Sequence, residues 1–341
     1  MSLSSLAVIQ QAMTRYVLPI TLGLGNVGNI ILIVFFSQKN HRMNSCSLYL
    51  LVAAFFGIVG GNCGVIPYVV ALYFPDPFNK FLVVCRLRLY IIYISAMSFR
   101  SMIVLATVDR FALSSSRQSF RALNSFIIAQ RATISIFIIW VIAGFHLLIW
   151  PTIQNDRCLV YGVYGFTYSI IQLITLGLLP TILMIIFGTF LKQNLHQSRA
   201  RVHHVARQGI NLNTTAFRKR DRFLIVLVYT EIFLTFIFTF PYASYAIYTA
   251  LTNNIPNKSA ERLQIESFTF FFTVSFLLYL GNSTTFYGYI ATSKTFRREV
   301  KTMLLRFVGR RPTTIDHEPA ENNMPIHTTN QTRSIISNIP H

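Results

Sequence analysis

The sequence predicts an all-α membrane protein, a seven-transmembrane helix bundle with an amphipathic helix after the seventh span. The composition is the first reason: 53% of the 341 residues are hydrophobic and only 12% are charged, whereas soluble domains carry roughly a quarter charged residues. The mean hydropathy of +0.49 points the same way. The third reason is that seven apolar runs are each long enough to cross the hydrocarbon core of a bilayer, which needs about 20 helical residues.

The seven runs alternate along the chain with segments that hold charged or turn-forming residues. They are Tyr16–Phe36, Ser45–Phe74, Leu89–Val108, Ala132–Trp150, Tyr161–Leu191, Phe223–Leu251 and Ser267–Thr292. A closed barrel, the other structure that spans membranes, would need strands of about 10 residues with alternating polarity. The runs lack that alternation, so each is predicted to be a helix. The second and fifth are longer than a bilayer requires, and we expect them to tilt or to project from it.

Three segments lie outside the predicted membrane domain of residues 16–292. Residues 1–15 are predicted to be a short N-terminus, and because no basic stretch precedes an apolar core there, no cleaved signal peptide is expected. Residues 293–311 place apolar side chains at helical spacing opposite a basic stripe, which predicts an amphipathic helix on an anionic lipid surface; a solvated basic helix is the alternative. Residues 312–341 are polar and are predicted to be a disordered tail.

Lys and Arg residues are distributed unevenly between the two sides of the spans. Most of them follow the first, third, fifth and seventh spans, as Lys39, Arg110 and the chain from Lys294 onward illustrate. Segments on the cytoplasmic side of membranes carry such an excess. The N-terminus is therefore predicted to be extracellular, and the amphipathic helix and the tail are predicted to be cytoplasmic.

The composition and the motifs also exclude several functions. A formal charge of +19 is compatible with nucleic-acid binding, but the charges lie between long apolar runs, so no nucleic-acid partner is expected. The four cysteines form no Cys-x-x-Cys pair, so no metal site is expected. The spans hold no Ser/His pair or His cluster, and the chain has no glycine-rich phosphate loop. We therefore expect neither an enzyme nor a cofactor.

An ordered set of residues resembles the rhodopsin-like (class A) G-protein-coupled receptors. Asp109-Arg110-Phe111 ends the third span and resembles their Asp-Arg-Tyr motif, with Cys85 at the family's spacing before it. Thr285-Phe286-Tyr287-Gly288-Tyr289 in the seventh span resembles their Asn-Pro-x-x-Tyr motif. Four landmarks fall in the expected helices: Asn29, Trp140, Pro180 and Pro241. The resemblance extends over nearly the whole predicted membrane domain.

The resemblance implies a receptor of the plasma membrane that passes an extracellular signal to a heterotrimeric G protein. Cys85 would be bonded to Cys158 in the second extracellular loop. Arg110 would couple to the G protein, and Asp221 would restrain it in the inactive state, with Tyr289 as a further switch residue. For Asp221 the alternative is a solvated acid within a basic run.

The departures from the family pattern indicate which branch the chain resembles. Gly57 stands where the family has a sodium-binding Asp, and Thr239 where it has a helix-six Trp. Phe286 stands in place of the helix-seven proline, and in this respect the chain resembles FMRFamide-type neuropeptide receptors. A peptide is therefore the expected type of ligand. Ile92 and Tyr279 replace the Asp of amine receptors and the Lys of retinal receptors, which argues against both of those ligands.

Two charges in the middle of spans fall outside the family pattern. Arg100 lies ten residues outward from Arg110, and Glu231 lies ten residues outward from Asp221. Arg100 and Glu231 are therefore both about 15 Å deeper in the membrane than Arg110 and Asp221. A direct pair would compensate both charges. The alternative is that each makes separate contacts to other polar groups, such as Ser98, Thr235 or buried water. A seven-helix channel or transporter is the alternative from another class, although the sequence shows no internal repeat of the kind transporters have. The substituted switch positions also keep open a receptor-like protein that does not signal.

Overall fold

The computed structural model confirms the bundle of seven apolar helices. It describes residues 3–74, 80–154, 157–160, 162–206, 215–252 and 258–307. Within these residues, seven helices are long and apolar enough to cross a membrane: Ser5–Phe36, Ser45–Val70, Leu82–Ser114, Phe126–Leu148, Gly162–Gln197, Phe223–Thr249 and Ala260–Thr292. The bundle belongs to a unit formed by Met1–Val300, and Lys301–His341 form a second unit. The predicted tail of residues 312–341 lies outside the described residues.

The first membrane helix begins earlier than the sequence predicted. It consists of α1 (Leu3–Ala12), the π-helix η1 (Met13–Val17) and α2 (Leu18–Phe36), where a start at Tyr16 was expected. The segment before Tyr16 contains no helix breaker, and Pro19 is accommodated because the π turn comes just before it. The Leu18 N–H bonds to the Met13 carbonyl five residues back, which re-routes the hydrogen bonds next to a residue that has no N–H to donate.

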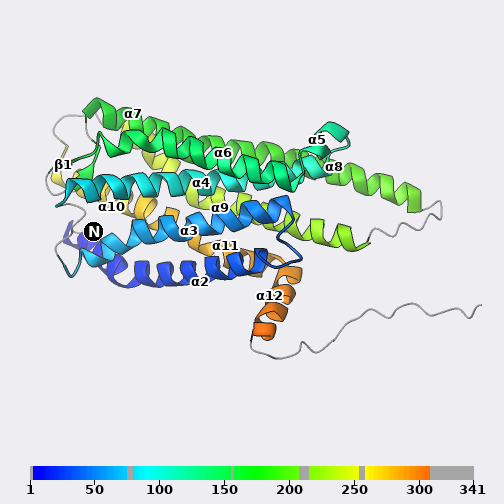
Figure 1. Ribbon diagram of the computed structural model, residues 1–341. Helices are drawn as coiled ribbons and strands as arrows, with labels where there is room; N and C mark the ends of the chain where they lie inside the picture. The colour runs from blue at the N-terminus through cyan, green and yellow to red at the C-terminus, as the bar shows by residue number, and fades with distance from the viewer. Residues whose placement is uncertain are drawn as a thin grey trace, which may run out of the picture. The chain divides into compact units, whose positions relative to one another are not determined.

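The second and third membrane helices are α3 (Ser45–Val70) and α4 (Leu82–Ser114), and they pack along each other (Figure 1). The side chain of Asn44 caps α3 by accepting the Ser47 N–H at 3.3 Å. Helix α4 extends beyond the predicted Leu89–Val108 at both ends because the charged residues there have partners and do not interrupt it. The short helix α5 (Gln118–Ala122), α6 (Phe126–Ala143) and the 3-10 turn η2 (Gly144–Leu148) complete this half.

A β-hairpin separates the two halves of the bundle along the chain. Strand β1 (Thr152–Gln154) pairs antiparallel with β2 (Arg157–Leu159), with Ile153 opposite Cys158. The second half consists of α7 (Gly162–Gln172), the π-helix η3 (Leu173–Leu178) and α8 (Leu179–Ala206), then α9 (Thr215–Thr252), then α10 (Ala260–Phe270), the π-helix η4 (Phe271–Leu277) and α11 (Leu278–Thr292). Helix α12 (Lys294–Phe307) follows, within the predicted amphipathic segment.

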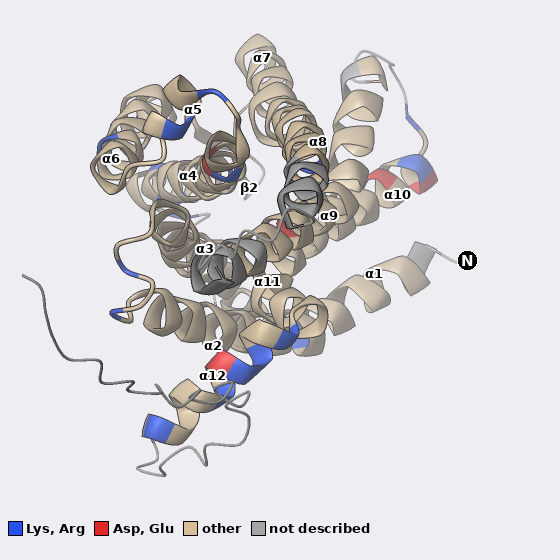
Figure 2. Ribbon diagram, turned by 90° about the vertical axis from the view of Figure 1, so that its right-hand side faces the viewer, with Lys and Arg blue, Asp and Glu red and all other residues tan. Residues whose placement is uncertain are grey.

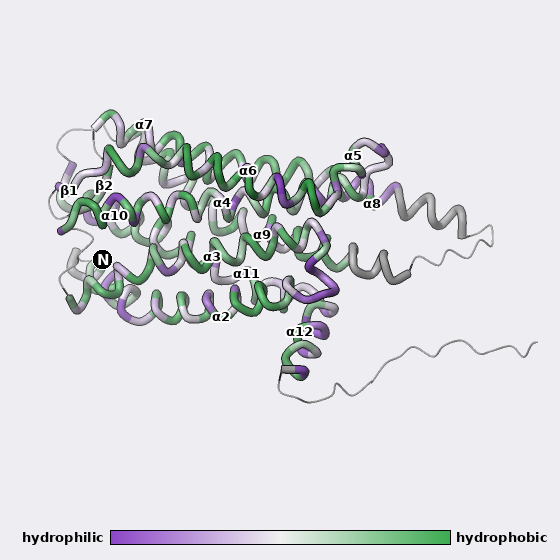
Figure 3. Tube along the Cα trace, viewed as in Figure 1, coloured by the Kyte–Doolittle hydropathy of each residue, from purple (hydrophilic) through white to green (hydrophobic). Residues whose placement is uncertain are grey.

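The outer faces of the helices are apolar, as a lipid-facing surface requires. Helix α6 has Ala129 as its one buried residue among those described, while Ile134, Ile138 and Ile142 are largely exposed. Figure 3 shows hydrophobic colouring along most of α6. Such a surface would be unstable in water. The described fold is that of a multi-pass membrane protein.

Close helix contacts inside the bundle depend on small residues. A Cβ atom at Gly28 of α2 would come within 2.9 Å of Phe286 Cβ on α11, and one at Gly64 of α3 would overlap the hydroxyl of Tyr279. Small residues at such positions let helix backbones approach closely where lipid supplies no hydrophobic driving force. Among the described residues, the interior also buries four side chains of the Asp, Glu, Lys and Arg types, those of Arg100, Asp109, Arg110 and Glu231.

Candidate functional site

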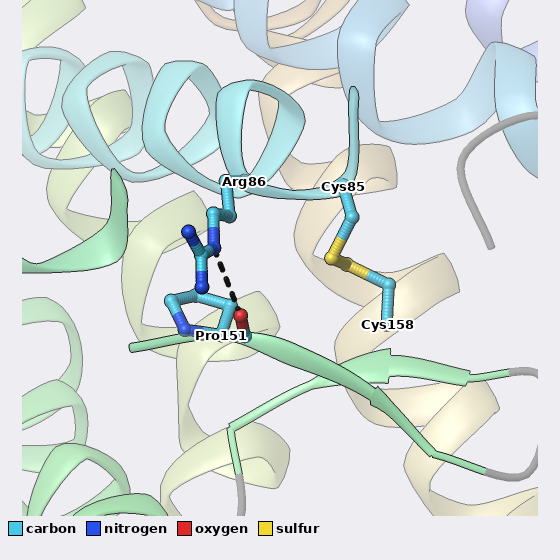
Figure 4. The surroundings of a disulfide bond; sticks show 4 residues. All are labelled: Cys85, Arg86, Pro151 and Cys158. Carbon is cyan, nitrogen blue, oxygen red and sulfur yellow. Dashed lines mark hydrogen bonds between the residues drawn. A yellow bond between two sulfur atoms is a disulfide. The ribbon is translucent and has the colours of Figure 1, made fainter. Parts of the chain in front are cut away.

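Helix α4 carries Arg100, Asp109, Arg110 and one cysteine of the disulfide, and it joins two candidate sites through a polar middle. At one end of α4, Cys85 is bonded to Cys158 of β2, with a Cα–Cα distance of 5.8 Å. Arg86 donates from Nε to the carbonyl oxygen of Pro151 at 3.1 Å, which fastens the strand that leads into the hairpin (Figure 4). The predicted cysteine pair is confirmed, and the hairpin is held against this end of α4.

The other end of α4 holds the Asp109–Arg110 pair. Arg110 is 1% exposed and Asp109 is 6% exposed. The Arg110 Nε donates to Asp109 Oδ2 at 3.1 Å, and its Nη2 lies 3.5 Å from Asn44 Oδ1. Asn124 Nδ2 donates to the second carboxylate oxygen of Asp109 at 2.8 Å. A buried ion pair is tolerated only when further hydrogen bonds satisfy its remaining atoms, and Asn44 and Asn124 supply them.

Sequence reasoning identified Asp109 and Arg110 but missed both asparagines. Asn44 carries a local signal, since an Asn directly before a helix is a preferred N-cap. Its second role as an acceptor for Arg110 depends on how α3 packs against α4. Asn124 lies between α5 and α6 and has no local signal that links it to Asp109.

Phe111, the third residue of the Asp-Arg-Phe motif, packs among other aromatic rings. The ring of Phe111 packs against Phe120, Phe187 and Phe190, with centroid distances of 5.7, 5.4 and 5.9 Å. A phenylalanine at this position therefore makes an apolar contact with α8. The side chain of Asp221 lies outside the described residues, so the predicted restraint of Arg110 by Asp221 stays a prediction.

Figure 2 views the bundle from the Arg110 end, where blue Lys and Arg residues gather on α5 and on the loop between α2 and α3.

Tyr289 of α11 lies in the interior at 1% exposure. Its ring packs edge-on against Phe296, which also contacts Phe35 and Phe223. Beside these rings, His41 Nε2 lies 3.2 Å from Glu299 Oε2. The first turns of α12 are thus attached to the bundle by an aromatic cluster.

Between the two ends, Arg100 and Glu231 lie at 5% and 2% exposure. They form no direct ion pair in the described structure. Arg100 Nη1 instead donates to Thr235 Oγ1 at 3.1 Å, one of the alternative partners named above. The Glu231 carboxylate lies near the hydroxyls of Thr285 and Tyr289, and it also interacts electrostatically with Arg100. The phase of the helices explains this, because the two side chains point past each other toward different neighbours.

The remaining landmarks occupy structural positions within the bundle. Trp140 Nε1 donates to Ser101 Oγ on α4 at 2.9 Å. Asn29 is buried against Gly57, where a Cβ atom would lie 3.2 Å from Asn29 Nδ2. Pro241 lies inside α9, and Pro180 comes directly after the π-helix η3. The Leu179 N–H bonds to the Ile174 carbonyl, the same five-residue spacing that comes before Pro19.

Comparison with known proteins adds no relative to this picture. No protein-family model matches the chain, and no curated protein matches it either. Among the residues that the structure describes, no group of three or more His, Cys, Asp or Glu residues is arranged to hold a metal ion. The buried polar residues and the disulfide are therefore the features of the described structure that bear on function.

Proposed function

We propose that the chain is a rhodopsin-like G-protein-coupled receptor of the plasma membrane, which converts the binding of an extracellular ligand into activation of a heterotrimeric G protein. One observation carries the proposal: the Asp109–Arg110 pair is buried and has further hydrogen bonds to Asn44 and Asn124, at the end of α4 opposite the Cys85–Cys158 bridge. A protein that needs only stability gains little from such a pair, because apolar residues of similar volume are often as stable.

The proposed mechanism uses the pair as a releasable contact. In the described structure the guanidinium of Arg110 is engaged by Asp109 and lies near Asn44. Movement of the neighbouring helices would free it at the cytoplasmic end, where the G protein binds. Pro241 removes a backbone hydrogen bond within α9 and provides a hinge for such movement. Ligand and G protein would then bias one equilibrium between two arrangements.

The orientation and the ligand belong to the same proposal. The excess of Lys and Arg at the Arg110 end supports a cytoplasmic location for that end, and the disulfide would then lie on the extracellular side, where oxidising conditions preserve it. The hairpin would then cover part of the ligand entrance. Ile92 offers no carboxylate for an amine, and we propose a peptide-type ligand.

The test is a G-protein activation assay in cells that express the full chain, screened with a library of peptides. Arg110→Ala should abolish the response at unchanged surface expression, because it removes the group that engages the G protein. Arg117→Ala is the matched control, since Arg117 is exposed next to α5 at the same end of the bundle. A well-expressed Arg110→Ala variant that signals normally would contradict the assignment, and so would a chain that activates no G protein with any ligand.

A channel or transporter is a second candidate, and Arg100 and Glu231 favour it. Ionisable residues deep in a membrane often mark an ion or proton path. Reconstituted liposomes would reveal such an activity as ion flux that Glu231→Gln removes. A receptor-like protein that does not signal would show neither flux nor G-protein activation.

A further inference from the structure

One stripe of α9 carries polar side chains into the interior of the bundle. Glu231, Thr235 and Thr239 recur every fourth residue and are 2%, 3% and 2% exposed. Residues four apart lie on the same face of a helix. In a chain whose outer surfaces are apolar, this stripe is a buried polar seam, and its contacts hold α9 to its neighbours.

Helices α9 and α4 are joined by a hydrogen bond between two buried side chains. Arg100 Nη1 donates to Thr235 Oγ1 at 3.1 Å. The guanidinium of Arg100 thus has a neutral partner on α9 and is not occupied by the carboxylate of Glu231, one turn away.

The contact of α9 with α11 is unusually close. A Cβ atom at Gly281 would lie 2.9 Å from Phe238 Cβ, and one at Gly288 would lie 2.9 Å from a methyl group of Leu234. The hydroxyls of Thr230 and Thr292 lie 2.8 Å apart across the same interface. The glycines bracket Thr285, so its side chain and that of Tyr289 face α9 at the level of Glu231.

Three polar atoms meet at this level without completing their hydrogen bonds. Glu231 Oε1, Thr285 Oγ1 and Tyr289 Oη are all buried, and none has a hydrogen-bond partner among the described residues. They are close enough to interact electrostatically. A carboxylate accepts hydrogen bonds and both hydroxyls can donate them, so the groups are chemically complementary. A small shift of α11 along α9 would let them bond, and leaving them unbonded in a low-dielectric interior is unfavourable.

We propose that Glu231 is a positioning residue that clasps α11 to α9 by accepting hydrogen bonds from Tyr289 and Thr285. In the closed clasp, the hydroxyls of Tyr289 and Thr285 both donate to the carboxylate of Glu231. Its importance for signalling rests on the proposed receptor function, because the closed clasp would resist the outward movement of α9. The clasp itself can be tested without ligand or G protein.

The first test is a double-mutant cycle on the thermal unfolding of the purified full-length chain. Tyr289→Phe removes only the hydroxyl and should lower Tm by about 2–4 °C. The same substitution should have no effect in a Glu231→Met background, where no carboxylate remains to accept its bond. Glu231→Gln keeps an acceptor oxygen and should preserve most of the effect of Tyr289→Phe. Equal losses in the native and Glu231→Met backgrounds would overturn the clasp.

Tyr287→Phe is the matched control. It removes a hydroxyl from the same helix, but that hydroxyl donates to the Leu24 carbonyl of α2 at 3.0 Å. Its effect on Tm should be the same in the native and Glu231→Met backgrounds. If Tyr287→Phe also lost its effect, the Glu231→Met variant would be perturbed as a whole, and the proposal would lose its support from this cycle.

The second test measures the distance between α9 and α11 with spin labels at Ile225 and Ala291. Tyr289→Phe should broaden the distance distribution, and Tyr287→Phe should leave it unchanged. A distribution that Tyr289→Phe does not alter would contradict the clasp, because a purely local packing role moves Tm without moving the helices. If both tests give the expected results but the chain activates no G protein, the proposed receptor function would be refuted and the clasp would still be supported.

Discussion

Arg110 is buried without an unpaired charge because its neighbours are arranged around Asp109. One carboxylate oxygen accepts from Arg110 and the other from Asn124. Removing one partner from such a pair costs more than the pair contributes, since a buried charge is left uncompensated, roughly 3–5 kcal/mol in soluble proteins. The arrangement at Asp109 therefore decides how firmly the arginine is held.

Asn124→Ala should destabilise the protein by about 1–3 kcal/mol, because it leaves the second oxygen of Asp109 without a donor. Asn124 also donates to Ser45 Oγ at 3.1 Å, so its loss loosens α3 as well. Thermal unfolding of the purified chain measures the effect. Asn194→Ala is the control, since Asn194 donates to Ser114 Oγ, which is no charged group. Equal losses for the two variants would show that the charge of Asp109 does not need Asn124.

The helices are fitted to one another by residues that do little on their own. Glycines permit the approach of α2 and of α9 to α11. The π segments η1 and η3 come directly before Pro19 and Pro180 and keep each helix continuous through its proline. Nothing in the surrounding sequence explains the third π segment, η4. Each of these features is local in sequence, but its effect is on how helices pack.

Two glycines of α2 should respond differently to the same substitution. Gly28→Ala places a methyl group 2.9 Å from Phe286 Cβ, which is the stem of the side chain and cannot rotate away. We expect a loss of about 1–3 kcal/mol in the free energy of unfolding. Gly23→Ala meets no atom within 4 Å and should be neutral or slightly stabilising, because alanine favours helix. Equal effects on Tm would contradict the close contact of α2 with α11.

Removing the disulfide should detach the hairpin from α4. Cys85 and Cys158 are separated by 73 residues, and the chain-entropy model gives about 4.4 kcal/mol for closing such a loop. The real effect is expected to be smaller because unfolded membrane helices stay inserted. Cys158→Ser should lower surface expression and ligand response. Mass spectrometry of non-reduced peptides checks the bond directly, and free thiols at both positions would contradict it.

The sequence was sufficient for features that depend on composition and spacing, and insufficient for those that depend on helix rotation. Seven long apolar runs predicted seven helices, and the resemblance to rhodopsin-like receptors implied the bonded pair Cys85 and Cys158. The start of the first helix at Leu3 was missed because Arg15 was taken as its boundary. Arg100 bonds to Thr235, and Glu231 lies near Tyr289. Both contacts follow from the rotation of α9 relative to its neighbours. A single run of residues does not reveal that rotation.

At the scale of the whole molecule, the distribution of charge and the apolar outer faces determine how the chain lies in a membrane. Lys and Arg concentrate at the Arg110 end of the bundle, while helices such as α6 present apolar side chains outward. The apolar faces fix the depth of the bundle in the bilayer, and the charges select one of two opposite orientations. In the proposed receptor, this orientation would decide which of the two sites faces the ligand and which faces the G protein.

The orientation can be tested with two matched cysteine variants in intact cells. Lys80 and Arg117 are both exposed basic residues, before α4 and before α5. If the excess of positive charge is cytoplasmic, Lys80→Cys should react with a membrane-impermeant maleimide on intact cells, and Arg117→Cys should react only after permeabilisation. The unsubstituted chain gives the background from Cys46, which is buried, and Cys63, which is partly buried. The reverse pattern would place the disulfide in the cytoplasm, where reducing conditions disfavour it, and would remove the basis for the proposed receptor.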